Sequence, residues 1–252
     1  MENGHYYLVD PQSGGMAQVK RSRVRIASLA TLVAGALVAG LAGCGGSQFT
    51  YVRDNEGETY FKVPASWQKV DHKPIQQILT GEDPNSETAR MRAQFVWTAA
   101  FDGDSKSPGA EHFIPLGVKA DEPFVYSVVQ PLTEEQRDTM SLNTLRNWVW
   151  PVTKTFRDQV TQANPQFPLQ NFELLADEVL DPGEGASGVH VRFNYQLGAT
   201  GETHTFDLTG YLNAGSTKVS VLLVRCSATC YRQRAAELDG ITQSFKIRKT
   251  LG

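Results

Sequence analysis

The sequence predicts an α+β domain in which an antiparallel sheet of about five to seven strands is flanked by helices. Two observations predict this class. In the C-terminal half, four segments alternate apolar and polar residues with a period of two, as half-buried strands do, and turn residues separate them. Before them, residues 133–160 carry apolar side chains at spacings of three and four, as one buried helix face does. The four segments are residues 172–180, 188–198, 203–212 and 217–226.

An apolar run precedes the domain. It spans residues 26–43 and follows four bases, Lys20, Arg21, Arg23 and Arg25. Its length is at the lower limit of what crosses a bilayer, about 20 residues. A basic segment, an apolar run and small residues at its end together predict a secretory signal. A short uncleaved anchor helix is the alternative.

The end of this run, Leu41-Ala42-Gly43-Cys44, resembles the bacterial lipobox. The resemblance implies that the Cys44 thiol carries diacylglycerol and that the bond between Gly43 and Cys44 is cut. The protein would then be a lipoprotein, held by its lipid at the extracytoplasmic face of the cell membrane. In the alternative, Cys44 stays unmodified.

These features divide the chain into three parts. Residues 1–43 are a cytoplasmic lead and a signal peptide, and translation begins at Met1 or Met16, because "MAQVKRSRVR" is itself a compact basic segment. Residues 44–58 are glycine-rich and then polar, which predicts a lipid-anchored tether. Residues 59–252 form a single α+β domain, long enough for one substantial core.

The charge balance argues against a nucleic-acid partner. Four of the 24 bases and two of the 27 acids precede residue 44, so residues 44–252 carry 20 bases and 25 acids. This acidic balance predicts no basic patch for nucleic acid or for anionic lipid. Lipid on Cys44, rather than charge, is the expected link to the membrane.

Cys226 and Cys230 are the remaining cysteines. Outside the cytoplasm such a pair is a candidate disulfide, here between the end of a strand and the start of a helix. A redox role is the alternative, although the spacing is C-x3-C and not C-x-x-C.

The elements before residue 133 follow from short patterns. A short strand ends at Pro64, and a turn holds Trp67. One or two helical turns end at Gly81. Residues 90–101 and 123–132 are rich in β-formers and predict two strands.

The helical region begins at Thr133, which forms a capping box with the first helical turn. Pro151 lacks an N–H and predicts a kink or two successive helices. The apolar stripe predicts one buried face packed on the sheet, with a ligand pocket between helices and sheet as the alternative. The stripe consists of Leu142, Leu145, Trp148, Val149, Val152, Phe156 and Val160.

Two turns predict the register of the C-terminal strands. With Ala199-Thr200 and Ala214-Gly215 at the turn centres, one face stays apolar across three strands. The other face, where Arg192 lies opposite Asp207, is partly polar and is expected to be solvated. The predicted pairs are Val191–Leu208, Phe193–Phe206 and Tyr195–His204, then Leu208–Val221 and Phe206–Leu223, with Thr209–Ser220 on the polar face.

The C-terminal segment predicts a helix followed by an edge strand. Tyr231, Ala235 and Leu238 form one stripe, Gly240 lies near the helix end, and residues 244–247 form the strand.

Two motifs resemble PsbP-like domains. "YFKVPASWQKV" looks like their F-x-x-P-x-x-W opening, on Phe61, Pro64 and Trp67, and "GITQSFKI" looks like their helix leading into an SF pair. The resemblance covers both ends of residues 59–248. It implies an αβα sandwich and a binding or assembly role without catalytic residues; some members are actinobacterial surface lipoproteins.

No catalytic, cofactor-binding or metal-binding residues are expected. In the predicted register His190 and His204 lie on opposite faces and cannot share a metal, while His72 and His112 lie in loops without ligand spacing. The chain has no G-x-S-x-G elbow and no phosphate-loop pattern. The acids around "DEVLDPGEG" lack the alternate oxygens of a calcium loop.

Three functions remain open. The first is a non-catalytic, membrane-anchored lipoprotein that binds a protein or a cell-envelope component. The second is a small-molecule or lipid-binding protein with a pocket between the helices and the sheet, near Trp148 and Trp150. The third is a hydrolase that uses His112 and an acid from residues 102–111.

Overall fold

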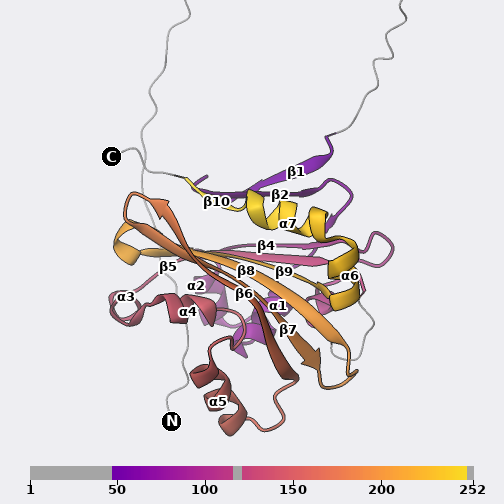
Figure 1. The fold of residues 1–252 in the computed structure, drawn as a ribbon. Coiled ribbons are helices and arrows are strands. Elements are labelled where there is room, and N and C mark those ends of the chain that lie inside the picture. Colours follow the sequence, from indigo (N-terminus) through magenta and orange to yellow (C-terminus); the bar gives the residue numbers. More distant parts are fainter. Residues whose placement is uncertain (1–46, 116–120, 249–252) are drawn as a thin grey trace, which may run out of the picture.

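The computed structural model describes residues 47–115 and 121–248. Seven strands form one antiparallel sheet, as the sequence predicts (Figure 1). In spatial order they are β3 (Gln68–Lys69), β4 (Trp97–Asp102), β5 (Phe124–Pro131), β9 (Lys218–Ser227), β8 (Thr203–Leu212), β7 (Ala186–Leu197) and β6 (Leu169–Gly183). Cys44, the bond after Gly43 and the whole signal segment lie outside the described residues.

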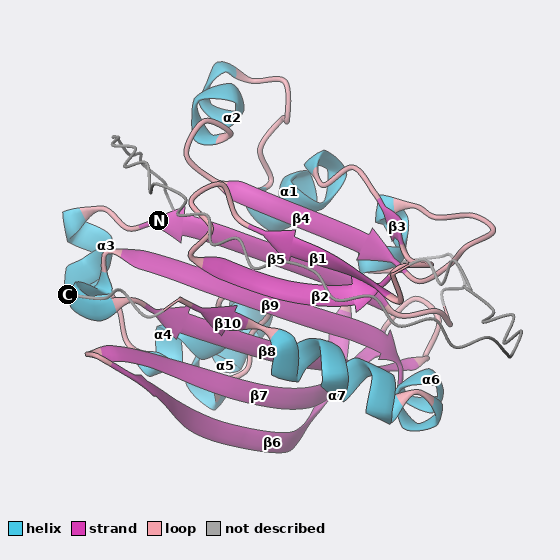
Figure 2. Cartoon of the chain, turned by 90° about the horizontal axis from the view of Figure 1, so that it is seen from above, coloured by secondary structure: helices cyan, strands magenta, loops and turns pink. Residues whose placement is uncertain are grey.

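A smaller sheet and two helices cover one face of this main sheet (Figure 2). They are β1 (Phe49–Arg53), β2 (Thr59–Pro64), β10 (Lys246–Ile247), α6 (Ala228–Gln233) and α7 (Ala235–Ser244). The separate small sheet was not predicted.

Short helices lie on the other side of the main sheet (Figure 1), and α2 projects beyond β4 (Figure 2). None of the described helices has the length and apolar character needed to cross a bilayer. They are α1 (Lys73–Thr80), α2 (Glu87–Arg92), α3 (Glu134–Thr139), α4 (Leu142–Arg146) and α5 (Lys154–Ala163), with single 3₁₀ turns at Ala110–Phe113 and Ala214–Ser216.

The predicted register between β7 and β8 is confirmed. Val191 pairs with Leu208, Phe193 with Phe206, and Tyr195 with His204. Except for His204, these residues belong to the apolar core beneath the helices, where the Phe193 and Phe206 rings stack with centroids 5.6 Å apart.

The register between β8 and β9 is shifted by two residues from the prediction, so Leu208 pairs with Leu223 and Phe206 with Arg225. The turn is longer than two residues because the side chain of Asn213 organises it. Asn213 Oδ1 accepts hydrogen bonds from the backbone N–H groups of Thr217 (2.9 Å) and Lys218 (2.8 Å). A shift of two preserves the alternation, so the apolar face stays in the same core.

The polar face of these strands is not solvated, contrary to expectation. Arg192 does lie opposite Asp207, but Thr209 lies opposite Leu222. Asp207 is fully buried, because α6 and α7 pack over this part of the sheet.

The predicted capping box at Thr133 is present: its Oγ1 accepts from Gln136 N at 3.2 Å, and the Gln136 side chain accepts from Thr133 N at 2.9 Å. Pro151 separates α4 from α5, as predicted. The prediction of a single buried stripe is wrong beyond this break. The chain turns at Pro151, and α5 has no buried residue.

Three predicted boundaries are wrong. Residues 49–53, assigned to the tether, form β1 and pair with β2, because Val52 is buried against the main sheet. Residues 90–92 end α2, whose first turn is capped by the Ser86 side chain, so the strand begins only at Trp97. Gly240 lies within α7, which continues to Ser244.

The residues of the two PsbP-like motifs meet in space. The Phe61 and Phe245 rings pack edge to face with centroids 6.3 Å apart. Lys62 N donates to Ser244 Oγ at 3.0 Å, and Trp67 Nε1 donates to Glu237 Oε1 at 3.2 Å. These residues therefore join the two ends of the chain and carry a structural role.

Candidate binding groove

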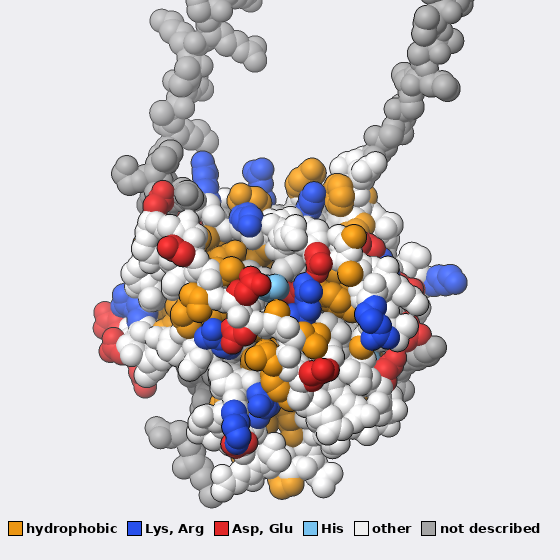
Figure 3. Space-filling view, viewed as in Figure 1, with side chains coloured by type: hydrophobic (Ala, Val, Ile, Leu, Met, Phe, Trp, Pro, Cys, Tyr) orange, Lys and Arg blue, Asp and Glu red, His pale blue; other side chains and the backbone are white. Residues whose placement is uncertain are grey.

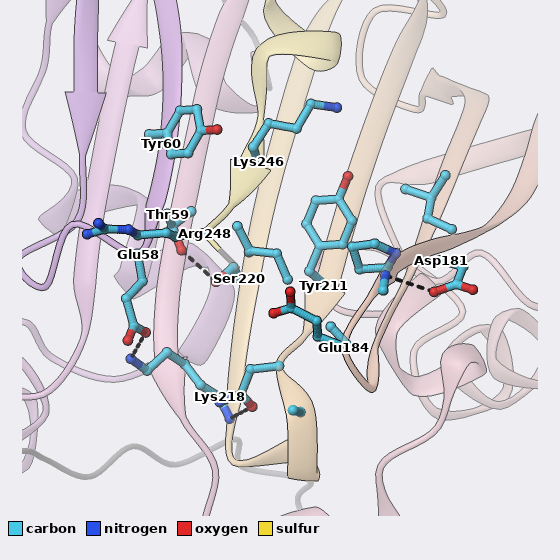
Figure 4. Close-up of a pocket in the computed structure, with 17 residues that line it drawn as sticks. Glu58, Thr59, Tyr60, Asp181, Glu184, Tyr211, Lys218, Ser220, Lys246 and Arg248 are labelled. Atoms are coloured by element: carbon cyan, nitrogen blue, oxygen red, sulfur yellow. Dashed lines mark hydrogen bonds and ion pairs between the residues drawn. The ribbon is translucent and has the colours of Figure 1, made fainter. Parts of the chain in front are cut away.

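A groove of about 820 Å³ lies between the small sheet and the tip of the β6–β7 hairpin (Figure 4). We call it the interlayer groove. Segments that are far apart in the sequence line it: residues 58–60, 180–186, 211–220 in part, and 246–248. Its volume lies within the range of small-ligand sites, about 300–1,000 Å³.

The floor of the groove joins the two sheets. Thr59 Oγ1 of β2 and Ser220 Oγ of β9 are hydrogen-bonded at 2.9 Å, and both residues are buried. Tyr211 stacks on Phe245 with ring centroids 5.6 Å apart. Leu180 and Ile247 add apolar surface. The floor thus combines a hydroxyl pair that joins the two sheets with apolar and aromatic surface.

The two rims carry opposite charges. Lys246 and Arg248 lie on the β10 side, and Asp181 and Glu184 lie on the hairpin side (Figure 4). Opposed rims of this kind would orient an elongated ligand that bears both charges.

A third base closes one end of the groove. The Lys218 ammonium bonds to Glu58 at 2.6 Å and also to Glu56. Burial would lower the pKa of Lys218, but the two carboxylates more than offset it and hold the pKa above its usual range. Lys218 therefore stays charged and its charge is locally neutralised.

The hairpin rim has a specified shape. Glu184 and Gly185, the two central residues of the turn, both have positive φ (55° and 78°), as a type I′ turn requires. Asp181 Oδ1 accepts from Gly183 N at 2.9 Å. Of the acids that the sequence raised as a calcium loop, Asp181 and Glu184 lie in this turn, whereas Asp177 pairs with Arg146 at 2.8 Å.

Within the described part of the chain, β10 is an edge strand of the small sheet, and its residues line the groove. Arg248 N donates to Glu58 O at 2.5 Å, and Lys246 pairs with Tyr60. Because backbone groups alternate in direction along an antiparallel strand, the N–H and C=O of Ile247 point away from β2. An added extended chain could pair with them.

The alternative of a ligand pocket between the helices and the sheet is wrong. Trp150 is buried there, 5.8 Å from the Phe113 ring and 6.2 Å from Phe206. A hollow of about 80 Å³ remains beside Trp148, too small for a ligand. Aromatic side chains fill this layer.

His112 does meet an acid from residues 102–111, as the hydrolase hypothesis requires. Its Nδ1 lies 2.7 Å from Asp102 Oδ2, and Asp102 is fully buried. Asp102 also accepts from Asp104 N and Gly109 N, both at 2.9 Å, so it shapes the loop. Among the described residues no hydroxyl or thiol hydrogen-bonds to His112.

A buried cluster around Arg225 adjoins this pair; we call it the base-centred cluster. Arg225 donates to the backbone oxygen of His112 and, at 3.1 Å, to His204 Nδ1. Burial lowers the pKa of Arg225 to about 10, although Asp102 and other carboxylates oppose it. Burial and the guanidinium lower the pKa of His204 to about 3, so His204 is neutral.

A second cluster lies on the opposite face of the sheet; we call it the acid-centred cluster. Asp207 bonds to His190 Nε2 at 2.8 Å, to Arg192 Nε at 2.8 Å and to the Tyr231 hydroxyl at 2.6 Å. Burial would raise the pKa of Asp207, but these partners lower it below its usual range. The bond to Asp207 raises the pKa of His190.

The histidines do not form a metal site. His190 and His204 lie on opposite faces, as the register predicted. Within residues 47–115 and 121–248, no three His, Cys, Asp or Glu side chains gather as metal ligands would.

Cys226 and Cys230 are joined by a disulfide, with Cα atoms 5.8 Å apart, between the end of β9 and α6.

No protein-family model matches the sequence, and no curated protein matches it. Several solved structures are similar in part, among them the following three. A cyanobacterial PsbP from Synechocystis has 15% identity and a TM-score of 0.48, over 83% of this chain and 98% of that one. LpqN, involved in cell envelope biogenesis of Mycobacterium tuberculosis, has 15% identity and a TM-score of 0.42, over 80% of this chain and 91% of that one. The Saccharomyces cerevisiae Ran-binding protein Mog1p has 9% identity and a TM-score of 0.41, over 80% of this chain and 96% of that one. Similarity this remote assigns neither a partner nor an activity.

Sequence reasoning missed the interlayer groove. Its lining comes from segments separated by more than 100 residues, and the small sheet that forms one wall was not predicted. The one local signal was the Asp181-Pro182-Gly183-Glu184-Gly185 turn, which the sequence shows but does not place.

Proposed function

We propose that this chain is a non-catalytic lipoprotein, anchored through Cys44 at the extracytoplasmic face of the cell membrane, and that its interlayer groove binds an extended segment of an envelope protein. The observation that carries the proposal is the groove itself, with its apolar floor and opposed charged rims. The lipobox-like end of the apolar run supports the anchor.

A protein segment fits the groove for three reasons. The N–H and C=O of Ile247 offer backbone pairing along one wall. Leu180 and Tyr211 offer an apolar floor for alternate side chains. The remaining side chains of the bound segment point away from the floor, and those that carry a charge can pair with the acidic or the basic rim. Backbone pairing gives affinity and the pockets give selectivity.

The anchor is tested by mass spectrometry of the protein extracted from membranes. We expect a chain that begins at Cys44 with a mass increment of acyl lipid, and a Cys44→Ala variant that lacks the increment. A full-length chain with bare Cys44 in the soluble fraction would refute the anchor.

The groove is tested by photo-crosslinking in the anchored protein. A photoreactive residue replaces Ala214, which lines the groove and is exposed, and in a matched chain it replaces the exposed Ala163 of α5. We expect a discrete adduct from position 214 alone, lost when Leu180→Arg is added. Equal adducts from both positions, or adducts that persist with Leu180→Arg, would contradict binding in the groove.

A small molecule or lipid is the second candidate for the same groove, favoured by its volume and apolar floor. Native mass spectrometry of the membrane-extracted chain distinguishes the two. A bound mass of a few hundred daltons, absent from the Ala214→Trp variant and retained in Ala163→Trp, would favour the small ligand.

A further inference from the structure

The outward side of the small sheet has an unusual composition. Successive residues of a strand point to opposite sides. In β1 and β2, Val52, Phe61 and Val63 are buried, so their neighbours face outward. We call the outward set the aromatic–basic face. It consists of Phe49, Tyr51, Arg53, Tyr60, Lys62 and Lys246.

These six side chains lie side by side. Arg53 and Lys246 flank Tyr60 across the three strands, and Tyr51 pairs with Lys62. The Lys62 ammonium lies 4.2 Å from the centre of the Phe49 ring. Bases and aromatic rings therefore alternate over one continuous surface, a local basic patch that the overall acidic balance did not predict.

The aromatic rings are exposed without an evident reason inside the fold. Tyr51 is 71% exposed and Tyr60 is 43% exposed. The strands FTYVR, TYFKVP and KI contain no acid, although the chain as a whole has more acids than bases. Figure 3 shows basic and hydrophobic side chains along the upper edge, where Figure 1 places β1, β2 and β10.

The position of this face in the chain is the second observation. Five residues lead from Cys44 to Phe49, the first residue of β1. A chain of five residues spans at most about 18 Å when fully extended. A lipid on Cys44 would thus hold the start of the aromatic–basic face within about that distance of the bilayer surface.

We propose that the aromatic–basic face docks on a bilayer that contains anionic phospholipid, and so sets the orientation of the domain on the membrane. This proposal rests on the lipid anchor of the proposed function. Bases near such a surface each favour binding, and tyrosine rings favour the interface between headgroups and acyl chains. The tether raises the local concentration of the face at the membrane and so strengthens the weak binding that three bases provide by themselves.

Docking would place the interlayer groove near the membrane, because Tyr60 and Lys246 belong both to the face and to the groove rim. The groove would then be open to segments that emerge from the bilayer surface. Arg53 and Lys62 belong to the face and not to the groove, so they can be changed separately.

The deciding experiment couples the chain chemically to lipid. In a chain of residues 44–252, all buried core residues are retained, because they lie between residues 52 and 245. Cys44 is its one free thiol, since Cys226 and Cys230 are joined. A maleimide phospholipid attaches it to vesicles whether or not cells modify Cys44, so failure here is separable from failure of the anchor.

Lysine acetylation by a water-soluble reagent then reports the contact. On vesicles of phosphatidylcholine with phosphatidylglycerol, we expect labelling of Lys62 to slow several-fold relative to phosphatidylcholine alone. Lys73 of α1, exposed on the far layer, serves as the internal control and should label equally on both. High salt should restore the labelling of Lys62.

Charge reversal provides the second test. Uncoupled chain should sediment with the anionic vesicles, and Arg53→Glu with Lys62→Glu should lower the partition coefficient at least about tenfold. The matched control, Lys73→Glu with Arg90→Glu, changes the same net charge on exposed residues of α1 and α2 and should bind as the parent does. Equal Lys62 labelling on both vesicle types, or equal losses in both double variants, would overturn the proposal.

Discussion

The two buried charged clusters lie on opposite faces of the same sheet and are built in opposite ways. In the acid-centred cluster the partners of Asp207 outweigh the cost of burial, because the pKa of Asp207 falls. In the base-centred cluster burial outweighs the partners, because the pKa of Arg225 falls to about 10. Burial alone therefore does not determine whether a charge is stabilised. The number of its bonded partners and the sign of their charges decide it.

The histidines report the same contrast. His190 bonds to a carboxylate, which raises its pKa, whereas burial and the neighbouring Arg225 guanidinium lower the pKa of His204 to about 3. Both clusters hold neighbouring elements together: α6 and α7 on the face of Asp207, and the loop around His112 on the other. Four substitutions test this comparison, from the largest expected effect to the smallest.

Asp207→Ala should have the largest effect. It leaves His190, Arg192 and the Tyr231 hydroxyl without their shared acceptor, and breaking a buried charge pair costs about 3–5 kcal/mol. Urea unfolding followed by circular dichroism measures the loss. The matched control is Asp239→Ala, at the exposed margin of the same cluster, which should cost about 1 kcal/mol or less. Equal losses from both variants would show that Asp207 is not the centre.

Acid should destabilise the protein through His204. The unfolded histidine has a pKa near 6.5 and the folded one about 3, so between these values the unfolded chain binds a proton that the folded chain excludes. The free energy of unfolding should therefore fall as pH falls below 6.5, by about 2 kcal/mol from pH 7 to pH 5. His204→Gln keeps an acceptor for Arg225 and should remove this part of the slope. An unchanged slope would mean that His204 protonates in place.

The sequence predicted the alternation of these strands better than their partners. Alternation is local: Phe193, Phe206 and Leu208 each follow polar neighbours, and this decides which face they join. The pairing of β8 with β9 depended on a turn in which the Asn213 side chain bonds two backbone groups, and the apolar pattern tolerates a shift of two. Hence Arg225, predicted nowhere as buried, faces Phe206.

The helices that cover the polar face of the main sheet could not be predicted from the strand patterns alone. Arg192 and Asp207 looked like a solvated pair, and only the packing of α6 and α7 buries Asp207. The interlayer groove depends on the same layer, with β10 contributing two residues beside β2. Such contacts join segments with no shared local pattern. The capping box at Thr133, which is local, could therefore be predicted from the sequence, whereas the groove could not.

Arg225→Met tests the other cluster. Methionine fills much of the same volume without a charge, so the cost of burying the guanidinium disappears. The His112 carbonyl and His204 Nδ1 lose their donors, which leaves a net loss of about 1–2 kcal/mol. Chemical denaturation should therefore show a smaller loss than for Asp207→Ala. A larger loss would reverse the comparison and identify Arg225 as the better stabilised charge.

His190→Gln should have the smallest effect and the opposite dependence on pH. The folded pKa of His190 is raised above its unfolded value, so the bond of charged His190 to Asp207 stabilises the protein fully below pH 6.5 and is lost as pH rises through the folded pKa. The variant should lose about 1 kcal/mol at pH 6 and less at pH 8. Unfolding curves at the two pH values, with His72→Gln as the control because His72 has no carboxylate bond among the described residues, measure the difference. A loss that grows toward pH 8 would mean that neutral His190 donates to Asp207, and that the two clusters do not bias their histidines in opposite directions.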